Sequence, residues 1–166
     1  MIYKNLSKSF LINIILVIII FALDRISKIY VMNMSNNILI SDIFSSKFLN
    51  ISLIWNEGIA FGLFSFDHNN LYNLLTIIIS VIIVIIFTMM IQQEGLKKYA
   101  LSMIFGGAIG NLYDRIFFKA VPDFIDFHIS DFHWFIFNIA DIFITVGVIF
   151  MIFYELIVIN NNHENN

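Results

Sequence analysis

Apolar residues gather in four long segments of the sequence, at residues 9–31, 70–91, 98–118 and 134–159. A helix needs about 20 residues to cross the hydrocarbon core of a bilayer. Each segment is long enough, so the pattern predicts four transmembrane helices. The third and fourth segments are less uniform than the first two, because polar side chains interrupt them.

The region between the first two segments, at about 36–66, has a different pattern. It contains short stretches typical of strands, such as 48–55, and no run long enough to cross a membrane. A turn with two glycines, Gly58 and Gly62, follows. Asn56 in this turn is either a turn former or a contact for a substrate, and the spacing does not separate the two.

The composition places the chain among membrane proteins. Of its 166 residues, 60% are hydrophobic and 13% are charged, and the mean hydropathy is +0.88. Soluble domains of this size are not so apolar, so we expect an all-α integral membrane protein with residues 1–166 in a single membrane domain. The sequence has no cysteine, which excludes disulfides, thiolate nucleophiles and cysteine metal sites. No basic run points to nucleic acid.

The distribution of charge predicts how the helices cross the membrane. Two lysines precede the first segment, and Lys97 and Lys98 lie between the second and the third. The loops at the opposite ends contain more acidic than basic residues. By the positive-inside rule, both termini and the turn at 92–98 are cytoplasmic, while residues 32–69 and 119–133 face outward.

Three carboxylates inside these segments fall at one depth. Asp24 lies roughly 22 Å from the cytoplasmic end of the first segment, Asp114 roughly 24 Å along the third, and Asp141 roughly 27 Å from the inner end of the fourth. Asp123 follows the third segment closely and can reach the same level. Because carboxylates inside a bilayer are costly, we interpret this polar layer near the outer surface as functional.

Basic neighbours distinguish two of these carboxylates from the third. Asp24 and Lys28 are four residues apart and share a helix face, so they can form a structural ion pair. Asp114 is expected to form a structural network with the adjacent Arg115, whose guanidinium could instead hold a phosphate or carbonyl of a ligand. Asp141 has no basic residue near it in its own segment.

Asparagines lie one helical turn from two of the carboxylates. Asn111 is three residues before Asp114, and Asn138 is three residues before Asp141, so each pair shares one helix face. Asn138 can orient Asp141 or hydrogen-bond a peptide. With Asp123 nearby, the best partner of Asp141 is another carboxylate, and such a pair can share one proton.

The loop between the third and fourth segments is rich in aromatic residues, which is typical of a belt at a membrane interface. Its acidic residues and histidines could be imagined as metal ligands; they are Asp126, His128, Asp131 and His133. The sequence has no HExxH motif, and alternation along a surface strand or loop explains the pattern. We therefore expect no metal.

Five sequence blocks, in order along nearly the whole chain, resemble the lipoprotein signal peptidases, or signal peptidase II. The blocks are Asp24 to Lys28; Asn56-x-Gly58-x-Ala60-Phe61; Gly106-Gly107-Ala108-x-Gly110-Asn111-x-x-Asp114-Arg115; Val121-x-Asp123-Phe124; and Phe137-Asn138-x-Ala140-Asp141. Each block alone is a weak signal, but five in order with four spans are a specific match. We expect Arg25, beside Asp24, to be peripheral.

The resemblance implies an aspartic endopeptidase of the bacterial cytoplasmic (inner) membrane. Such an enzyme removes signal peptides from diacylglyceryl-modified prolipoproteins by cleaving before the lipidated cysteine. The resemblance assigns the catalytic dyad to Asp123 and Asp141. It assigns substrate contacts to Asn56, Asn111, Arg115 and Asn138, and structural polar support to Asp24, Lys28 and Asp114.

The resemblance also implies an architecture and a set of partners. The architecture is four transmembrane helices with a small extracytoplasmic β-cradle and an interfacial helix at about 36–66, and an active site near the outer leaflet. The implied partners are the diacylglyceryl-prolipoprotein substrate, membrane lipids and cyclic peptide inhibitors of the globomycin type. No cofactor is expected.

Two other functions remain open on the residues alone. Intramembrane Asp and Arg residues also mark ion paths, so a proton- or ion-coupled transporter is the main alternative. Against it, four segments without an internal repeat leave little room for alternating access. A non-enzymatic assembly subunit would dock through Gly106 and Gly110, which are otherwise expected to pack helices closely, but it leaves Asp123 and Asp141 unexplained.

Overall fold

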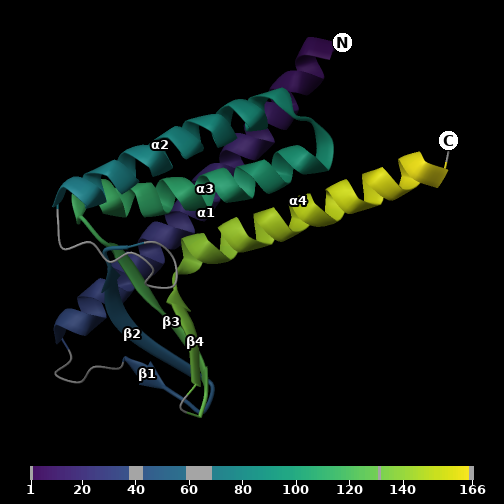
Figure 1. Cartoon of the computed structure of the whole chain (residues 1–166). Helices are drawn as coiled ribbons and strands as arrows, with labels where there is room; N and C mark the ends of the chain where they lie inside the picture. The colour runs from purple at the N-terminus through teal and green to yellow at the C-terminus, as the bar shows by residue number, and fades with distance from the viewer. Residues whose placement is uncertain (1, 38–42, 59–68, 131, 165–166) are drawn as a thin grey trace.

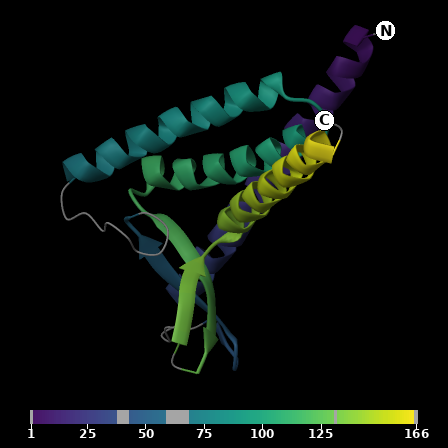
Figure 2. The ribbon, with the colours of Figure 1, turned by 45° about the vertical axis from the view of Figure 1, so that its right-hand side comes forward.

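The computed structural model describes residues 2–37, 43–58, 69–130 and 132–164. The helices pack against one another, and a small sheet projects from one end of them (Figure 1, Figure 2). The helices are α1 (Ile2–Asn37), α2 (Asn69–Gln92), α3 (Gly95–Phe117) and α4 (Ile139–Glu164). The strands are β1 (Phe44–Ser45), β2 (Leu49–Asn56), β3 (Val121–Ile129) and β4 (Phe132–Phe137). The described fold is therefore mostly helical.

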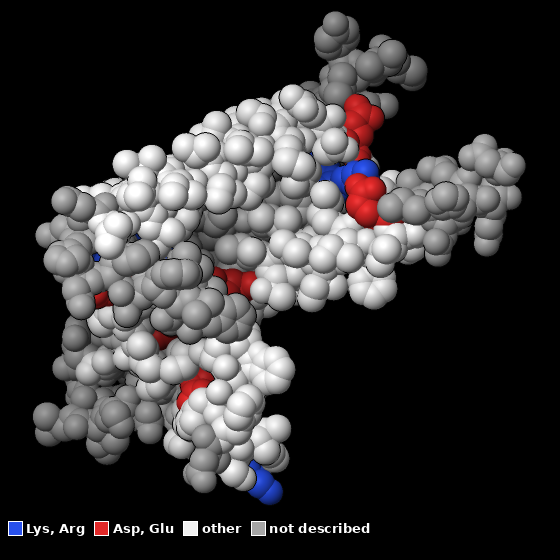
Figure 3. Space-filling model, in the orientation of Figure 1, with Lys and Arg blue, Asp and Glu red and all other residues white. Residues whose placement is uncertain are grey.

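Three of the described helices are long and apolar enough to cross a membrane, over Lys8–Ser35, Leu71–Gln92 and Ile139–Ile157. Many of their large apolar side chains remain exposed on the outside of the molecule. An apolar surface of this extent suits lipid and not water. Figure 3 shows the same feature, because the helical surface drawn there carries few charged side chains. The chain is a multi-pass membrane protein.

The remaining helix, α3, carries more polar residues and lies among the others. It contacts α1, α2 and α4. Ser102, Asp114 and Arg115 of α3 are buried against these neighbours. A helix surrounded by protein can keep polar side chains that find partners there, which explains why its sequence is less uniformly apolar.

Glycines allow α3 to approach two neighbours closely. A Cβ atom added to Gly106 would lie 3.1 Å from a side chain of α1, and one added to Gly110 would lie 2.5 Å from a carboxylate oxygen of Asp24. A Cβ atom at Gly107 would lie 2.5 Å from the backbone oxygen of Ala140 in α4. The close helix packing expected of Gly106 and Gly110 is therefore confirmed, and it occurs within the chain.

The Gly107→Ala variant is expected to lower the free energy of unfolding by about 1–3 kcal/mol, because its methyl group would push α3 away from the backbone of α4. Gly106→Ala is the matched control, since its methyl group would meet the side chain of Ile20 at 3.1 Å and a backbone oxygen only at 3.3 Å. Thermal unfolding of both variants in detergent micelles measures the difference. Equal losses of stability at the two positions would contradict this assignment.

The sheet has the order β1-β2-β3-β4, with each strand antiparallel to its neighbours. β1 and β2 fall in the region expected to contain strands, whereas β3 and β4 come from the expected aromatic loop after α3. The fold is therefore mostly helical with a small antiparallel sheet, as the resemblance implied, but two of the strands come from outside the region at 36–66. Residues 38–42 and 59–68, with Gly62 among them, and Asp131 lie outside the described residues.

The expected fourth span at 134–159 began too early. Residues Phe132–Phe137 form β4, which pairs with β3, and α4 begins only at Ile139. The strand and the helix are both apolar and adjacent, so hydropathy alone does not show where one ends. As a result Asn138 occupies the joint between β4 and α4, where the sheet meets the helices.

Candidate active site

A cavity of about 360 Å³ lies where the sheet joins the helices. Its polar lining contains two carboxylates, two amides and a guanidinium, from Asp123, Asp141, Asn56, Asn111 and Arg115. Side chains of α2, α3, α4 and β4 supply an apolar remainder. In Figure 3 acidic atoms are visible in the recess between the helices and the sheet. The cavity is therefore an apolar site with a few convergent polar groups, which is typical of a binding site.

Asp123 on β3 is held by two amides. Asn56 at the end of β2 donates from Nδ2 to one carboxylate oxygen at 2.9 Å, and Asn138 donates from Nδ2 to the other at 2.6 Å. The Oδ1 atom of Asn56 also accepts the backbone N–H of Gly58 at 2.9 Å. Asn56 is thus a turn former whose other side-chain atom contacts Asp123.

Asp141 and Asn138 form a reciprocal cap at the start of α4. The backbone N–H of Asn138 donates to Asp141 Oδ2 at 3.1 Å, and the backbone N–H of Asp141 donates to Asn138 Oδ1 at 3.1 Å. This is the arrangement of a capping box, and a negative charge there is favoured by the helix dipole. The cap fixes the backbone that presents Asp141 to the cavity and Asn138 to Asp123.

Asn111 connects Asp141 to a buried lysine. Its Nδ2 donates to Asp141 Oδ1 at 2.8 Å. Its Oδ1 accepts from Lys28 Nζ at 2.9 Å and from Asn138 Nδ2 at 3.2 Å. With this last bond, Asn138 forms hydrogen bonds with Asp123, Asp141 and Asn111. Lys28 can only donate to Asn111, and the ionised carboxylate of Asp141 can only accept from it, so the orientation of the Asn111 amide is fixed.

The surroundings of Asp123 favour its protonated form. Burial is the largest cause and raises its pKa, and the neighbouring charge of Asp141 raises it further, to about 6. Hydrogen bonds from Asn56 and Asn138 and the positive charge of Lys28 oppose this shift. The two carboxylates are thus close enough for their titrations to be coupled.

Behind the cavity, two acidic and two basic side chains form a buried cluster. Lys28 Nζ lies 2.9 Å from Asp24 Oδ1 and 2.7 Å from Asp114 Oδ2, and all three side chains are fully buried. Arg25 contacts both oxygens of Asp114 and lies 2.8 Å from Asp24. Asp24 also accepts the backbone N–H of Ala140 at 3.2 Å. The cluster balances its charges and joins α1 to α3 and α4.

This cluster confirms one expected ion pair and corrects two expectations. Asp24 and Lys28 pair as expected. Asp114 pairs with Arg25 and Lys28 in α1, and not with its neighbour Arg115. Asp114 faces α1, whereas Arg115 lines the cavity, so the two side chains have different neighbours. Arg25 is consequently a central member of the cluster and not peripheral.

Arg115 lines the cavity and binds the loop that follows β2. Its Nη2 donates to the backbone oxygen of Gly58, while its Nη1 is buried without a partner among the described residues. Tyr72 in α2 donates its hydroxyl to the backbone oxygen of Arg115 at 3.3 Å, and its ring lies 5.8 Å from the guanidinium carbon. Arg115 therefore keeps one donor that a ligand could use.

Sequence reasoning missed the parts played by Arg25 and Tyr72. A cation in the middle of an apolar segment was a usable signal for Arg25, because such a charge needs a partner inside the protein. Tyr72 carries no comparable signal, since a tyrosine near a helix end is also common at membrane interfaces.

Comparisons with known proteins agree with the motifs. The model of the family "Signal peptidase (SPase) II" matches residues 16–157. Lipoprotein signal peptidase of Pelagibacter ubique (strain HTCC1062) is 47% identical over 159 residues, covering 96% of this chain and 95% of the relative. That of Anaplasma phagocytophilum (strain HZ) is 42% identical over 148 residues, covering 88% and 92%. A solved bacterial membrane enzyme superposes with a TM-score of 0.71 at 33% identity over 90% of both chains. The chain therefore belongs to the signal peptidase II family.

Proposed function

We propose that this chain is a membrane aspartic endopeptidase that removes signal peptides from diacylglyceryl-modified bacterial prolipoproteins. The observation that carries the proposal is the pair Asp123 and Asp141. Both carboxylates line one cavity, and Asn138 forms hydrogen bonds with both residues. The relatives named above are lipoprotein signal peptidases, which supplies the class of substrate. The lipidated cysteine would follow the cleaved bond.

The proposed chemistry uses one proton shared by the two carboxylates. The ionised carboxylate takes a proton from a water molecule, whose oxygen attacks the scissile carbonyl carbon. The protonated carboxylate donates its proton to the carbonyl oxygen and stabilises the tetrahedral intermediate. Collapse of this intermediate breaks the C–N bond. The leaving amine takes the proton that the first carboxylate received from water, and a hydroxyl group of the intermediate returns a proton to the second carboxylate. The reaction needs neither a covalent nucleophile nor a cofactor.

The same cavity suits an extended peptide next to lipid. Peptide bonds in a helix are shielded by their own hydrogen bonds, so the substrate must be held extended near the dyad. Arg115 retains a buried donor, and Asn56, Asn111 and Asn138 line or adjoin the site. These four side chains would bind the substrate backbone. Apolar side chains from the helices would accept the acyl chains, and globomycin-type cyclic peptides would compete for this space.

We further propose that all four helices cross the bacterial inner membrane as a single membrane domain over 1–166. Both termini would be cytoplasmic, and the sheet and dyad would lie at the outer leaflet, where water and the lipidated substrate can meet. The lysine distribution supports this direction. A proton-coupled transporter is less well supported, because the dyad lies at one end of the helices beside the sheet.

Incubation of the purified chain with a diacylglyceryl-modified prolipoprotein tests the proposed activity. We expect one cleavage, immediately before the lipidated cysteine, which mass spectrometry of the products would identify. A globomycin-type peptide is expected to block it. Reconstituted protein that leaves this substrate intact but conducts protons across liposomes would overturn the proposal in favour of a transporter.

The pH dependence of cleavage is a separate prediction. Since Asp123 has a pKa of about 6, the pair loses its shared proton as the pH rises past that value, and kcat/KM is expected to fall. The Asn56→Leu variant removes a hydrogen bond that lowers this pKa, so the falling limb should move to higher pH. Rates measured between about pH 4 and 8 would reveal the shift. If the falling limb of the Asn56→Leu variant stayed at the same pH or moved to lower pH, the titration of Asp123 would not be what controls the rate.

A further inference from the structure

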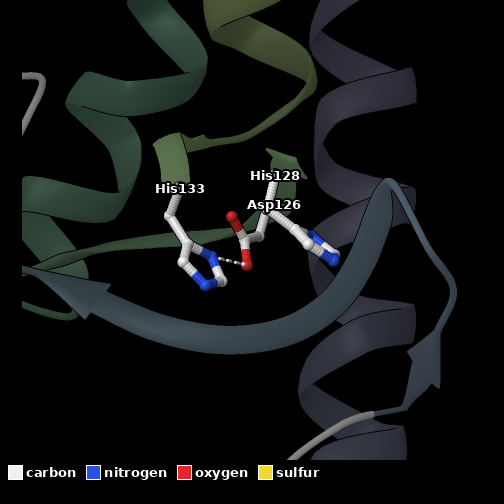
Figure 4. Close-up of side chains that lie close together, drawn as sticks. All are labelled: Asp126, His128 and His133. Atoms are coloured by element: carbon white, nitrogen blue, oxygen red, sulfur yellow. Dashed lines mark hydrogen bonds and ion pairs between the residues drawn. The ribbon is translucent and has the colours of Figure 1, made fainter. Parts of the chain in front are cut away.

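The β3–β4 hairpin gathers an acidic residue and two histidines on one side of the sheet (Figure 4). His128 on β3 is directly paired with His133 on β4. Asp126 precedes His128 by two residues, and the pairing of β3 with β4 shifts its register between them. One potential ligand atom from each of the three residues lies within 4.8 Å of the others. The antiparallel register therefore creates this cluster from residues that are separated by the turn.

Hydrogen bonds within the hairpin leave two buried atoms of the cluster unpaired. His133 Nδ1 lies 2.8 Å from Asp126 Oδ2, and Asn50 on β2 approaches the same oxygen at 3.5 Å. Asp126 is only 4% exposed. Its Oδ1 atom and the Nδ1 atom of His128 are buried without a partner among the described residues. Buried polar atoms are almost always paired, so two unpaired atoms in one cluster require an explanation.

We propose that Asp126, His128 and His133 bind one divalent transition-metal ion of the Zn²⁺ or Cu²⁺ class. Two imidazole nitrogens and one carboxylate oxygen suit these ions, with water completing the coordination. Neighbouring ligand atoms around such an ion are about 3–4 Å apart, given bonds of about 2.1 Å. The contact of 2.8 Å between His133 and Asp126 is already close to this spacing. This proposal replaces the expectation, based on alternation, that no metal binds here.

The metal site is distinct from the proposed active site. Asp123 lines the cavity of the proposed active site. None of the three proposed ligands lines the cavity with the aspartate pair. Aromatic side chains surround the hairpin beside the cluster, including Phe127, Phe132 and Trp134. A bound ion would tie β3 to β4 and thereby stabilise the strand that carries Asp123.

Zn²⁺ titration of the purified full chain tests the site. The protein should carry an affinity tag without histidine and be stripped of metal first. We expect one Zn²⁺ ion per chain and an unfolding temperature that rises with Zn²⁺ concentration. With Cu²⁺ as the probe, the electron paramagnetic resonance spectrum should show coupling to imidazole nitrogen. Neither readout depends on peptidase activity, so failure here would leave the proposed function untouched.

Variants decide whether these residues are the ligands. His128→Gln and His133→Gln are each expected to weaken Zn²⁺ binding by about 100-fold, and Asp126→Asn is expected to weaken it as well. His163→Gln, which removes a histidine near the C-terminus, is the matched control and should bind like the unchanged chain. His133 is 53% exposed, so its variant should fold, as the metal-free unfolding temperature would show. A His133→Gln variant that binds Zn²⁺ as tightly as His163→Gln would overturn the proposal.

Discussion

Asp141→Asn is expected to reduce cleavage of a lipidated prolipoprotein by about 10³-fold or more, because an amide can neither take a proton from water nor share one with Asp123. The change is nearly isosteric. The Asn138 backbone N–H can still donate to the oxygen of the new side chain, so the cap of α4 should survive. Initial rates with the purified variant, at substrate concentrations above and below KM, would separate a loss of kcat from a loss of binding.

Glu155→Gln is the matched control for this variant. It makes the same change from carboxylate to amide, in the same helix, at a side chain that is 47% exposed and pairs with Lys97. Its cleavage rate and unfolding temperature should stay close to those of the unchanged chain, because exposed ion pairs contribute little. Substantial cleavage by a folded Asp141→Asn variant would refute the assigned role, and Asp123→Asn should reproduce the loss independently.

The parts of the candidate site that depend on residues close together in the sequence could be predicted. Asp141 stood out because a carboxylate in an apolar run is costly, and its partner Asn138 is three residues away, the spacing of a capping box. Basic neighbours separated Asp24 from Asp141, and the structure agrees, since Asp24 lies in the ion cluster. The spacing of four residues already brought Lys28 to Asp24.

Contacts between distant segments could not be predicted in the same way. The pairing of Arg25 with Asp114 joins two helices, and nothing in either segment states which helices are neighbours. β4 was hidden for a related reason: an apolar strand beside an apolar helix gives one continuous hydropathy signal, and only pairing with β3 distinguishes them. The cluster of Asp126 with two histidines likewise depends on the register of that pairing.

Lys28→Met should cause the largest loss of stability among single variants of the ion cluster. Lys28 is fully buried and contacts Asp24, Asp114 and Asn111. Without it, two buried carboxylates share only Arg25, and removing one partner of a buried ion pair costs about 3–5 kcal/mol. Asn111 would also lose the donor that helps fix its amide, so the hydrogen bond to Asp141 should weaken and kcat should fall.

Two comparisons separate the charge of Lys28 from the mere loss of a lysine. Lys97→Met removes a lysine from a partly exposed ion pair, so its unfolding temperature in detergent should hardly change. The double variant Asp24→Asn with Lys28→Met removes one charge of each sign and leaves Arg25 with Asp114, so it should regain much of the lost stability. If Lys28→Met unfolded at the same temperature as Lys97→Met, the cluster would not be what holds α1 against α3. A double variant less stable than Lys28→Met alone would show that hydrogen bonds of Asp24, including that from Ala140, matter more than charge balance.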